Sequence, residues 1–434
     1  MSDALLQDVR TRESVGTAEG PEWLEPLRRA GAARFAAAGF PAARDEEWRF
    51  TPIGPIVQTS WVPSAPGGEE PGRERLQPFI FGHPEWTTLV FVNGWYNEAL
   101  SHVGPLPDGV RVASLAEALR ADGSLLEAHL GRQAPIEGSG FTALNAALFR
   151  DGGIVSVAPG VQLANPVHLV FVTTPDSAGT ATHPRNLIVV GRGARASVVE
   201  SYVTLAPAQT YWTNPVTEVV AAAGSWIEHT RIQRESELAY HVGLTHVEQA
   251  RDSHYRSFTM AMGAALSRHN LHVRLNDENV ETLMYGLYLT RGEQVADNHT
   301  AIFHDQPNCR SWEVYKGVLD GRSRAVFNGK VFVKPEAQKT DAKQTNRNLL
   351  LSDGAKVDTK PQLEIFADDV RCTHGATVGR LDDLALFYAR SRGIPLLAAE
   401  RLLTYAFAAE VIEEVELEPV RRELERLVRE RLAG

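Results

Sequence analysis

The segment Leu271-His272-Val273-Arg274-Leu275 alternates strictly between apolar and polar side chains. Successive side chains of a β-strand point to opposite faces, so this period of two predicts a strand with one buried and one polar face. The run Ala196-Ser-Val-Val-Glu-Ser-Tyr-Val-Thr-Leu205 has a similar strand-like composition. From about Gly153 onward, helical spacing is missing for roughly 220 residues, which predicts a long, mainly β region.

Short strings of the form Gly-x-x-apolar, or slightly longer, recur through this region at separations of 31, 39, 29, 29 and 33 residues. A repeat of about 20–50 residues is typical of solenoids and propellers. Each unit holds two runs of about ten residues joined by polar turns, which favours a coil of two long strands over a four-stranded blade. The glycines are predicted to provide positive φ angles at the corners. They are Gly193, Gly224, Gly263, Gly292, Gly321 and Gly354. Because the string is a common one, an unrelated β-sandwich is the alternative.

Helical spacing is present on both sides of the repeats. Residues 22–39 and 141–150 are predicted helices, and Ser114 is predicted to cap another, whereas residues 87–94 have the pattern of a short strand. The chain is therefore predicted to consist of three regions. These are an N-terminal helical and mixed region (1–152), a parallel β-helix core (153–380) and a C-terminal helical region (381–434).

Four apolar residues of the C-terminal region, Leu403, Phe407, Val411 and Val415, form one stripe at four-residue steps. Such a stripe indicates a helix with one apolar face. This face has two interpretations: it binds a partner protein, or it packs onto the protein's own core.

Composition excludes several classes of protein. The 434-residue chain has a net charge of -10 and no visible basic patch, so a nucleic-acid partner is not expected. Its first residues, 1–14, lack a basic-then-apolar signal, and no stretch approaches the roughly 20 apolar residues that span a bilayer. Two cysteines, Cys309 and Cys372, are too few for a disulfide framework, so we expect a cytoplasmic protein with reduced thiols. They are also too few for the four thiolates that an iron–sulfur cluster usually takes.

Several long motifs resemble the SufB/SufD family of the SUF iron–sulfur cluster assembly system. The densest resemblance covers residues 346–352, 355–379 and 386–394, and it extends to Asp45-Glu-Glu-Trp-Arg-Phe-Thr51 and Lys339-Thr-Asp-Ala-Lys-Gln344. The string Cys372-Thr-His-Gly-Ala-Thr-Val-Gly379 resembles the SufD branch, since the SufB branch typically carries a different string here and a cysteine motif upstream.

The resemblance implies a right-handed parallel β-helix between two helical regions. It also implies a non-catalytic scaffold subunit that pairs with a SufB-like subunit and binds a SufC-like ATPase through its C-terminal helices. The complex would receive sulfur from a cysteine desulfurase system and build a cluster at the SufB–SufD interface, with a role in iron entry attributed to this subunit. No cofactor is expected to bind stably to this chain alone; a transient cluster or iron would be shared with the SufB-like partner.

His374 matches the histidine that the family places at this interface, and it is the main candidate ligand. Imidazole is a borderline ligand that binds iron in its neutral form. Cys372 lies two residues away, so both side chains face the same side of a strand, and it is the weaker candidate. The same parity includes Val370, Ala376 and Val378. An inward-facing core row is therefore the alternative for both residues, because free cysteine is commonly buried.

Other functions fit less well. His299, His304, Asp305 and Cys309 resemble a metal cluster on paper, but they satisfy no known ligand spacing, and we interpret residues 299–310 as a solvated loop. Without a P-loop, the chain is not expected to hydrolyse ATP. A carbohydrate-active β-helix enzyme is disfavoured by the missing signal peptide and carboxylate cluster. A purely structural partner of the ATPase, without a ligand role for His374, remains an alternative, and an exposed last coil makes a homodimer plausible.

Overall fold

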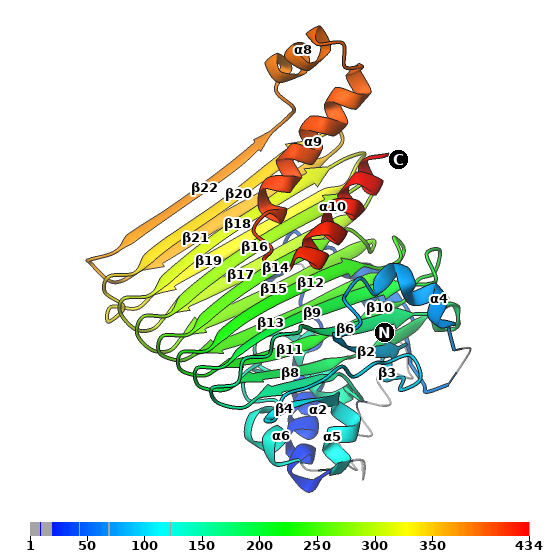
Figure 1. Cartoon of the computed structure of the whole chain (residues 1–434), viewed down its shortest axis with the longest axis vertical. Helices are drawn as coiled ribbons and strands as arrows, with labels where there is room; N and C mark the ends of the chain where they lie inside the picture. The colour runs from blue at the N-terminus through cyan, green and yellow to red at the C-terminus, as the bar shows by residue number, and fades with distance from the viewer. Residues whose placement is uncertain (1–8, 10–19, 43, 68–69, 122, 434) are drawn as a thin grey trace.

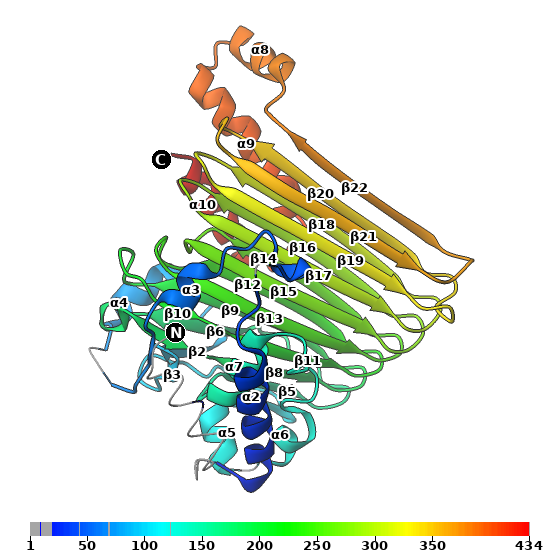
Figure 2. The ribbon, with the colours of Figure 1, turned by 180° about the vertical axis from the view of Figure 1, so that it is seen from behind.

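The centre of the computed structural model, which describes residue 9 and residues 20–42, 44–67, 70–121 and 123–433, is a parallel β-solenoid of about eight turns (Figures 1 and 2). The strands form two sheets, A and B, which face each other across the core, and from β11 to β22 successive strands alternate between them. Each coil therefore consists of two strands, and the predicted mainly β fold is confirmed.

From β12 to β22, every strand except the eight-residue β14 is nine or ten residues long, and each pairs in parallel with a strand of the next coil. Sheet A contains β1 (Val62–Pro63), β4 (Val110–Ser114), β5 (Gly153–Val157), β7 (Thr180–Thr182), β8 (Arg185–Val190), β10 (Trp212–Thr213), β11 (Val216–Ala221), β13 (Tyr240–Gln249), β15 (Leu266–Leu275), β17 (Val295–His304), β19 (Arg324–Val333) and β21 (Lys356–Ile365). Sheet B contains β2 (Thr87–Val92), β3 (Trp95–Tyr96), β6 (Val167–Thr173), β9 (Arg195–Thr204), β12 (Trp226–Arg234), β14 (His254–Ala261), β16 (Glu281–Thr290), β18 (Arg310–Leu319), β20 (Asp341–Leu350) and β22 (Arg371–Gly379).

Helices flank the solenoid at both ends of the sequence. The N-terminal ones are α2 (Glu25–Ala38), α3 (Gly54–Gln58), α4 (Arg73–Leu76), α5 (Leu115–Ala121), α6 (Ser124–His129) and α7 (Gly140–Leu148), with short 3₁₀ turns at Glu22–Leu24, Glu46–Trp48, Gln77–Phe79 and Pro175–Ser177. The C-terminal ones are α8 (Asp383–Ser391), α9 (Leu396–Ile412) and α10 (Glu418–Ala433). The hydroxyl of Ser114 accepts a hydrogen bond from the Glu117 amide, so the predicted cap at the start of α5 is confirmed.

The corners of the solenoid use glycine in two ways. Gly193, Gly224, Gly292 and Gly321 have φ angles of 64°, 65°, 59° and 69°, as the repeat predicted. Gly263 has no positive φ, so the prediction is wrong there: a Cβ at this position would lie 2.3 Å from the Glu235 amide nitrogen. Gly354 likewise has no positive φ, and a Cβ there would lie 2.6 Å from the Gly321 carbonyl oxygen, so both glycines allow close approach of backbones.

The two ends of the stack differ. At one end, β4 pairs antiparallel with β5 and β3 pairs antiparallel with β2, and helices α2, α5 and α6 lie beside them (Figure 1). Residues 1–152 thus contribute strands to both sheets. At the other end, β21 pairs with β19 and β22 with β20, and each has one neighbouring strand only. We call this exposed pair of strands the open rim.

The C-terminal helices return along the outer face of sheet B. Buried residues of α9 and α10, including Val411 and Leu424, share a hydrophobic cluster with Ile232, Leu287 and Val318 of the sheet. In contrast, α8 lies beyond the open rim (Figures 1 and 2). The side chain of Asp382 accepts a hydrogen bond from the Leu384 amide and caps α8.

Candidate functional site

His374 and Cys372 lie on β22, at the open rim. Their Cα register partners on β20 are Gln344 and Ala342, so the predicted shared parity of the two side chains is confirmed. His374 is exposed, and its interpretation as a buried core histidine is wrong, because no further coil covers this strand. Cys372 is half-buried and packs against the core. At the rim, the imidazole of His374 is thus exposed while the thiol of Cys372 is partly covered.

Cys372 is less suited than His374 to binding a metal. Burial raises the pKa of its thiol, and the nearby carboxylate of Asp341 adds to the rise, whereas a hydrogen bond from the Ala342 backbone opposes it. The thiolate is the form that binds metal, so this shift disfavours Cys372 as a ligand at neutral pH.

The predicted solvated loop around residues 299–310 does not exist. His299 and His304 lie on β17, and Cys309 is buried in the turn that follows. His304 is hydrogen-bonded to the Ser311 hydroxyl, 2.8 Å from its Nε2 atom, while burial raises the pKa of the Cys309 thiol to about 11. These side chains do not converge: within the described part of the chain, no three His, Cys, Asp or Glu residues are placed to hold a metal ion.

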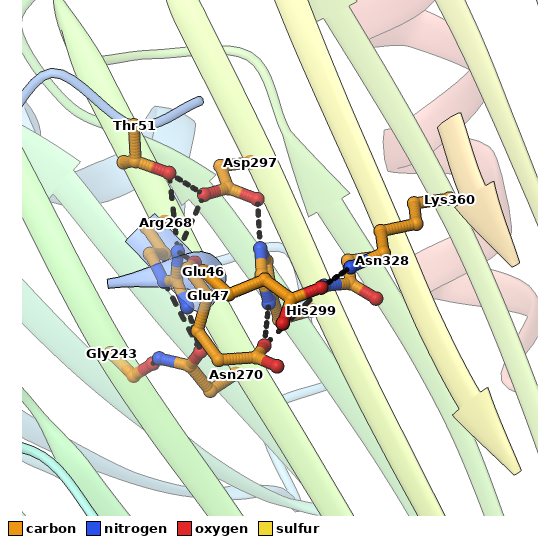
Figure 3. A network of polar contacts seen from close by, with 10 residues as sticks. All are labelled: Glu46, Glu47, Thr51, Gly243, Arg268, Asn270, Asp297, His299, Asn328 and Lys360. Carbon is orange, nitrogen blue, oxygen red and sulfur yellow. Dashed lines mark hydrogen bonds and ion pairs between the residues drawn. The ribbon is translucent and has the colours of Figure 1, made fainter. Parts of the chain in front are cut away.

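His299 instead holds the segment 45–51, which we call the N-terminal strap, against the outer face of sheet A (Figure 3). The His299 Nδ1 atom lies 3.2 Å from Glu47 Oε2, and its Nε2 atom lies 3.0 Å from Asp297 Oδ1. Arg268 donates from Nη1 to Asp297 Oδ2 (2.9 Å) and to the Glu47 carbonyl oxygen (2.6 Å). Its guanidinium also stacks on Trp48, 3.7 Å from the ring centroid. The strap thus joins residues more than 200 positions apart in the sequence.

The charges of this network satisfy one another. Burial raises the pKa of Asp297, but His299 and Arg268 outweigh that effect and hold it below the usual value. The pKa of Glu47 is also lowered, chiefly by its hydrogen bond from His299. Beside the network lies a pocket of about 220 Å³ that includes His272 and Lys330 in its lining. A buried network with several charge-assisted contacts is suited to fixing the strap in place.

The interior contains two histidine–glutamate pairs that the sequence did not single out. His229 Nε2 lies 3.0 Å from Glu200 Oε1, and His241 Nδ1 lies 2.5 Å from Glu235 Oε2. All four side chains are buried between the sheets. The sequence offers one signal for these pairs, which is a polar residue at a position of a strand that faces the core. His229 is an example, because it lies two residues after the buried Ile227 on β12 and so faces the same side. Their mutual pairing explains how these groups are tolerated in a core.

The predicted partner-binding stripe, whose last member Val415 lies just beyond the end of α9, is divided by the structure. Val411 and Val415 are each 1% exposed and pack in the cluster under the helix, whereas Leu403 and Phe407 are half-buried. The alternative interpretation, packing onto the protein's own core, therefore describes Val411 and Val415.

A different apolar surface of the C-terminal region is exposed. Leu384 and Phe387 of α8 are 73% and 69% exposed, and further large side chains continue onto α9. We call this the α8–α9 apolar surface; it consists of Leu384, Phe387, Tyr388, Leu396, Leu397 and Leu402. Apolar patches of this kind on a monomer commonly mark an interaction site.

No helix among the described residues is long and apolar enough to cross a membrane. Two family models cover most of the chain: the SufBD protein N-terminal region matches residues 10–169, and the model described as "SUF system FeS cluster assembly, SufBD core domain" matches residues 171–407. The second alone spans more than half of the 434 residues.

Full-length relatives agree with the family models. The chain is 33% identical to an iron–sulfur cluster assembly SufBD family protein of Synechocystis over 98% of this chain and 95% of the relative. It is 32% identical to the iron–sulfur cluster assembly protein SufD of Escherichia coli over 100% of this chain and 98% of the relative. It is also 31% identical to the chloroplastic protein ABCI7 of Arabidopsis thaliana over 90% and 82%. From the two family models and these relatives, we conclude that the chain belongs to the SufBD family of the SUF system for iron–sulfur cluster assembly.

Proposed function

We propose that this chain is the SufD-like scaffold subunit of a complex in which a SufB-like subunit docks on the open rim and a cluster is assembled between them. The observation that carries this proposal is the exposed His374 on an unpaired edge strand. An unpaired edge offers backbone N–H and C=O groups to another strand, so a second solenoid can continue both sheets.

His374 would supply one imidazole to the nascent cluster, and the partner would supply the cysteines. Fe–S clusters usually take four thiolates, with histidine as an occasional substitute. The described residues place no second strong ligand beside His374, since the thiol of Cys372 is half-buried. A cluster shared in this way is held weakly by each subunit, which suits a scaffold that transfers its product. Iron and sulfide are substrates here, with sulfur supplied by a cysteine desulfurase system.

A SufC-like ATPase would bind the α8–α9 apolar surface. Its exposed members lie on the two helices that extend furthest beyond the solenoid (Figure 1). Leu403 and Phe407 lie further along α9 and could join this contact, whereas Val411 and Val415 would stabilise the base of the helix. The chain itself would act without catalysis, in the cytoplasm, where its two unpaired thiols stay reduced.

The test is co-expression with SufB-like and SufC-like partners, comparing wild-type protein with His374→Ala. We expect a complex to form in both cases and the variant to contain less iron and acid-labile sulfide and to absorb less near the iron–sulfur charge-transfer bands. His83→Ala is the matched control, since this histidine is also exposed but lies outside the solenoid strands. If the wild type, His374→Ala and His83→Ala contain equal amounts of cluster, His374 is not a ligand, and the chain acts as a purely structural partner of the ATPase.

A second variant tests the ATPase contact. Phe387→Asp places a charge in the α8–α9 apolar surface without touching the rim, because Phe387 is largely exposed. We expect it to lose the ATPase subunit from the purified complex while retaining the SufB-like subunit. Retention of the ATPase at wild-type stoichiometry would assign this contact to another surface.

A further inference from the structure

His374 is the outermost member of a polar row that continues into the solenoid. In sheet B, Glu313 of β18 is the register partner of Gln344 on β20, and Gln344 is the register partner of His374 on β22. Neighbouring strands lie about 4.8 Å apart, so the three side chains follow one another at that spacing on the inward side of the sheet. The exposed imidazole therefore has a buried amide directly behind it.

Gln344 is held by Glu313 but is not fully satisfied. Its Nε2 atom donates to Glu313 Oε2 at 2.8 Å. Because the amide directs its nitrogen toward Glu313, its oxygen is left on the other side of the group. Gln344 Oε1 is buried and has no hydrogen-bond partner, although the residue is only 2% exposed. A buried amide oxygen without a hydrogen-bond donor lowers the stability of the folded state, so a donor is expected at this atom.

The facing sheet is shaped around this amide. A Cβ atom at Gly329 of β19 would lie 2.1 Å from Gln344 Nε2 and 2.7 Å from its Cδ, so only glycine leaves room for the amide. Asn-Gly is a common hairpin-turn pair, but Asn328 and Gly329 lie in the middle of β19. Gly329 is thus explained by the side chain that it accommodates.

We propose that Gln344 is a positioning residue for His374: its amide oxygen accepts the N–H of the imidazole, and Glu313 holds the amide in that orientation. The inference rests on the proposed role of His374 as a ligand. A histidine that binds a metal through one ring nitrogen generally donates from the other to a fixed acceptor, which sets the tautomer and the ring orientation. His374 lies in an exposed strand, where Gln344 is the inward-facing neighbour able to provide that acceptor.

The carboxyl group of Glu313 supports this arrangement. Burial raises its pKa to about 7, and hydrogen bonds from Thr300 and Gln344 oppose the rise. Above neutral pH the ionised carboxylate accepts from the amide nitrogen, which keeps the amide oxygen free for His374.

The first experiment uses the full-length chain without partners at pH 8, with the histidines labelled with ¹⁵N. We expect His374 to populate mainly one tautomer in the wild-type protein and to approach the ratio of a free imidazole in Gln344→Met, which keeps the volume but lacks the acceptor. Gln344→Glu retains an oxygen acceptor and should restore the wild-type tautomer. The inference is overturned if the His374 spectrum is the same in the wild type and Gln344→Met.

The second experiment measures cluster content and iron affinity in the co-expressed complex. Losing such an outer partner typically lowers metal affinity by about 10–100-fold, and we expect a loss in that range for Gln344→Met. Gln233→Met is the matched control, because Gln233 is equally buried on sheet B and donates to a glutamate, but its strand β12 lies five strands from the rim strand β22. An equal loss in both variants would overturn the inference by showing a general effect of core damage. If His374→Ala has no effect, the proposed function fails, whereas an effect of His374→Ala without one of Gln344→Met refutes the positioning role alone.

Discussion

Replacing Asp297 by alanine should release the N-terminal strap from sheet A. Asp297 is fully buried and Arg268 is 3% exposed, so the substitution leaves a guanidinium in a dry environment without its carboxylate. Breaking one partner of a buried pair costs about 3–5 kcal/mol. Opening the strap hydrates Arg268 again, so this cost falls on the closed state and favours local opening.

The expected effect can be expressed as an exchange rate. Since about 1.4 kcal/mol corresponds to a factor of ten, the opening equilibrium should shift by roughly 100- to 4,000-fold. The amides of Trp48 and Thr51 report it, because they donate to the carbonyl oxygens of Asp45 and Trp48 within the strap. Hydrogen exchange followed by mass spectrometry of the peptide covering residues 45–51 is the assay.

A surface pair on the same segment provides the control. Lys360 is paired with Glu46, with side chains 35% and 74% exposed, and such pairs contribute about 0–1 kcal/mol. Lys360→Ala should therefore accelerate exchange of the strap by less than about 5-fold. The reasoning is refuted if Asp297→Ala leaves strap exchange at the wild-type rate, or if it accelerates exchange equally throughout the solenoid.

Three further outcomes follow from the structure. Gly317→Ala should lower the free energy of unfolding by about 1–3 kcal/mol in urea titrations, because a Cβ would lie 2.0 Å from a ring carbon of Tyr288; an unchanged value contradicts this packing. Lys316→Met should loosen α9, since the buried ammonium donates to the Phe407 carbonyl oxygen at 2.9 Å; we expect faster tryptic cleavage within α9 and α10, and wild-type cleavage rates would argue against this anchor. The pKa of Asp297 is lower in the folded state than in the unfolded chain, where it is about 3.9. The ionised carboxylate therefore stabilises the closed strap above the unfolded pKa, and this stabilisation is lost as the pH falls through the folded pKa. Pepsin should accordingly cut the strap first below about pH 4, whereas simultaneous cleavage across the solenoid would contradict the prediction.

Period-two alternation and glycine spacing were sufficient to predict the solenoid because they are local consequences of its geometry. Each coil returns the chain to the same corner, and the backbone there requires positive φ, as at Gly193 and Gly292. Gly263 and Gly329 show the limit of this signal. Gly263 is required by the close approach of the Glu235 backbone, and Gly329 by the space that the Gln344 amide occupies. A local sequence pattern does not distinguish these causes from a positive φ angle.

The candidate site was predictable in part. Parity placed Cys372 and His374 on one side of a strand, and this was correct. Whether this face of the strand is buried depends on whether another coil stacks on β22. The sequence of β22 does not show this, because its side chains alternate as they do in strands that lie between two coils. The family resemblance, and not the pattern, directed attention to His374.

Residues 299–310 were misinterpreted for a different reason. Their polar character looked like a loop, but His299 is polar because it faces Glu47, 252 positions earlier in the chain. Polarity that is satisfied by a distant segment has no local sequence signature.

One end of this stack is finished by antiparallel strands and helices, and the other is not. Such a unit has a polarity, and it can grow in one direction only. Two units that meet through their unfinished ends leave no free edge for a third, so elongation stops at a pair. Pairing through unpaired strand edges is thereby limited to a single joining event, so these edges offer no route to an open-ended chain of solenoids.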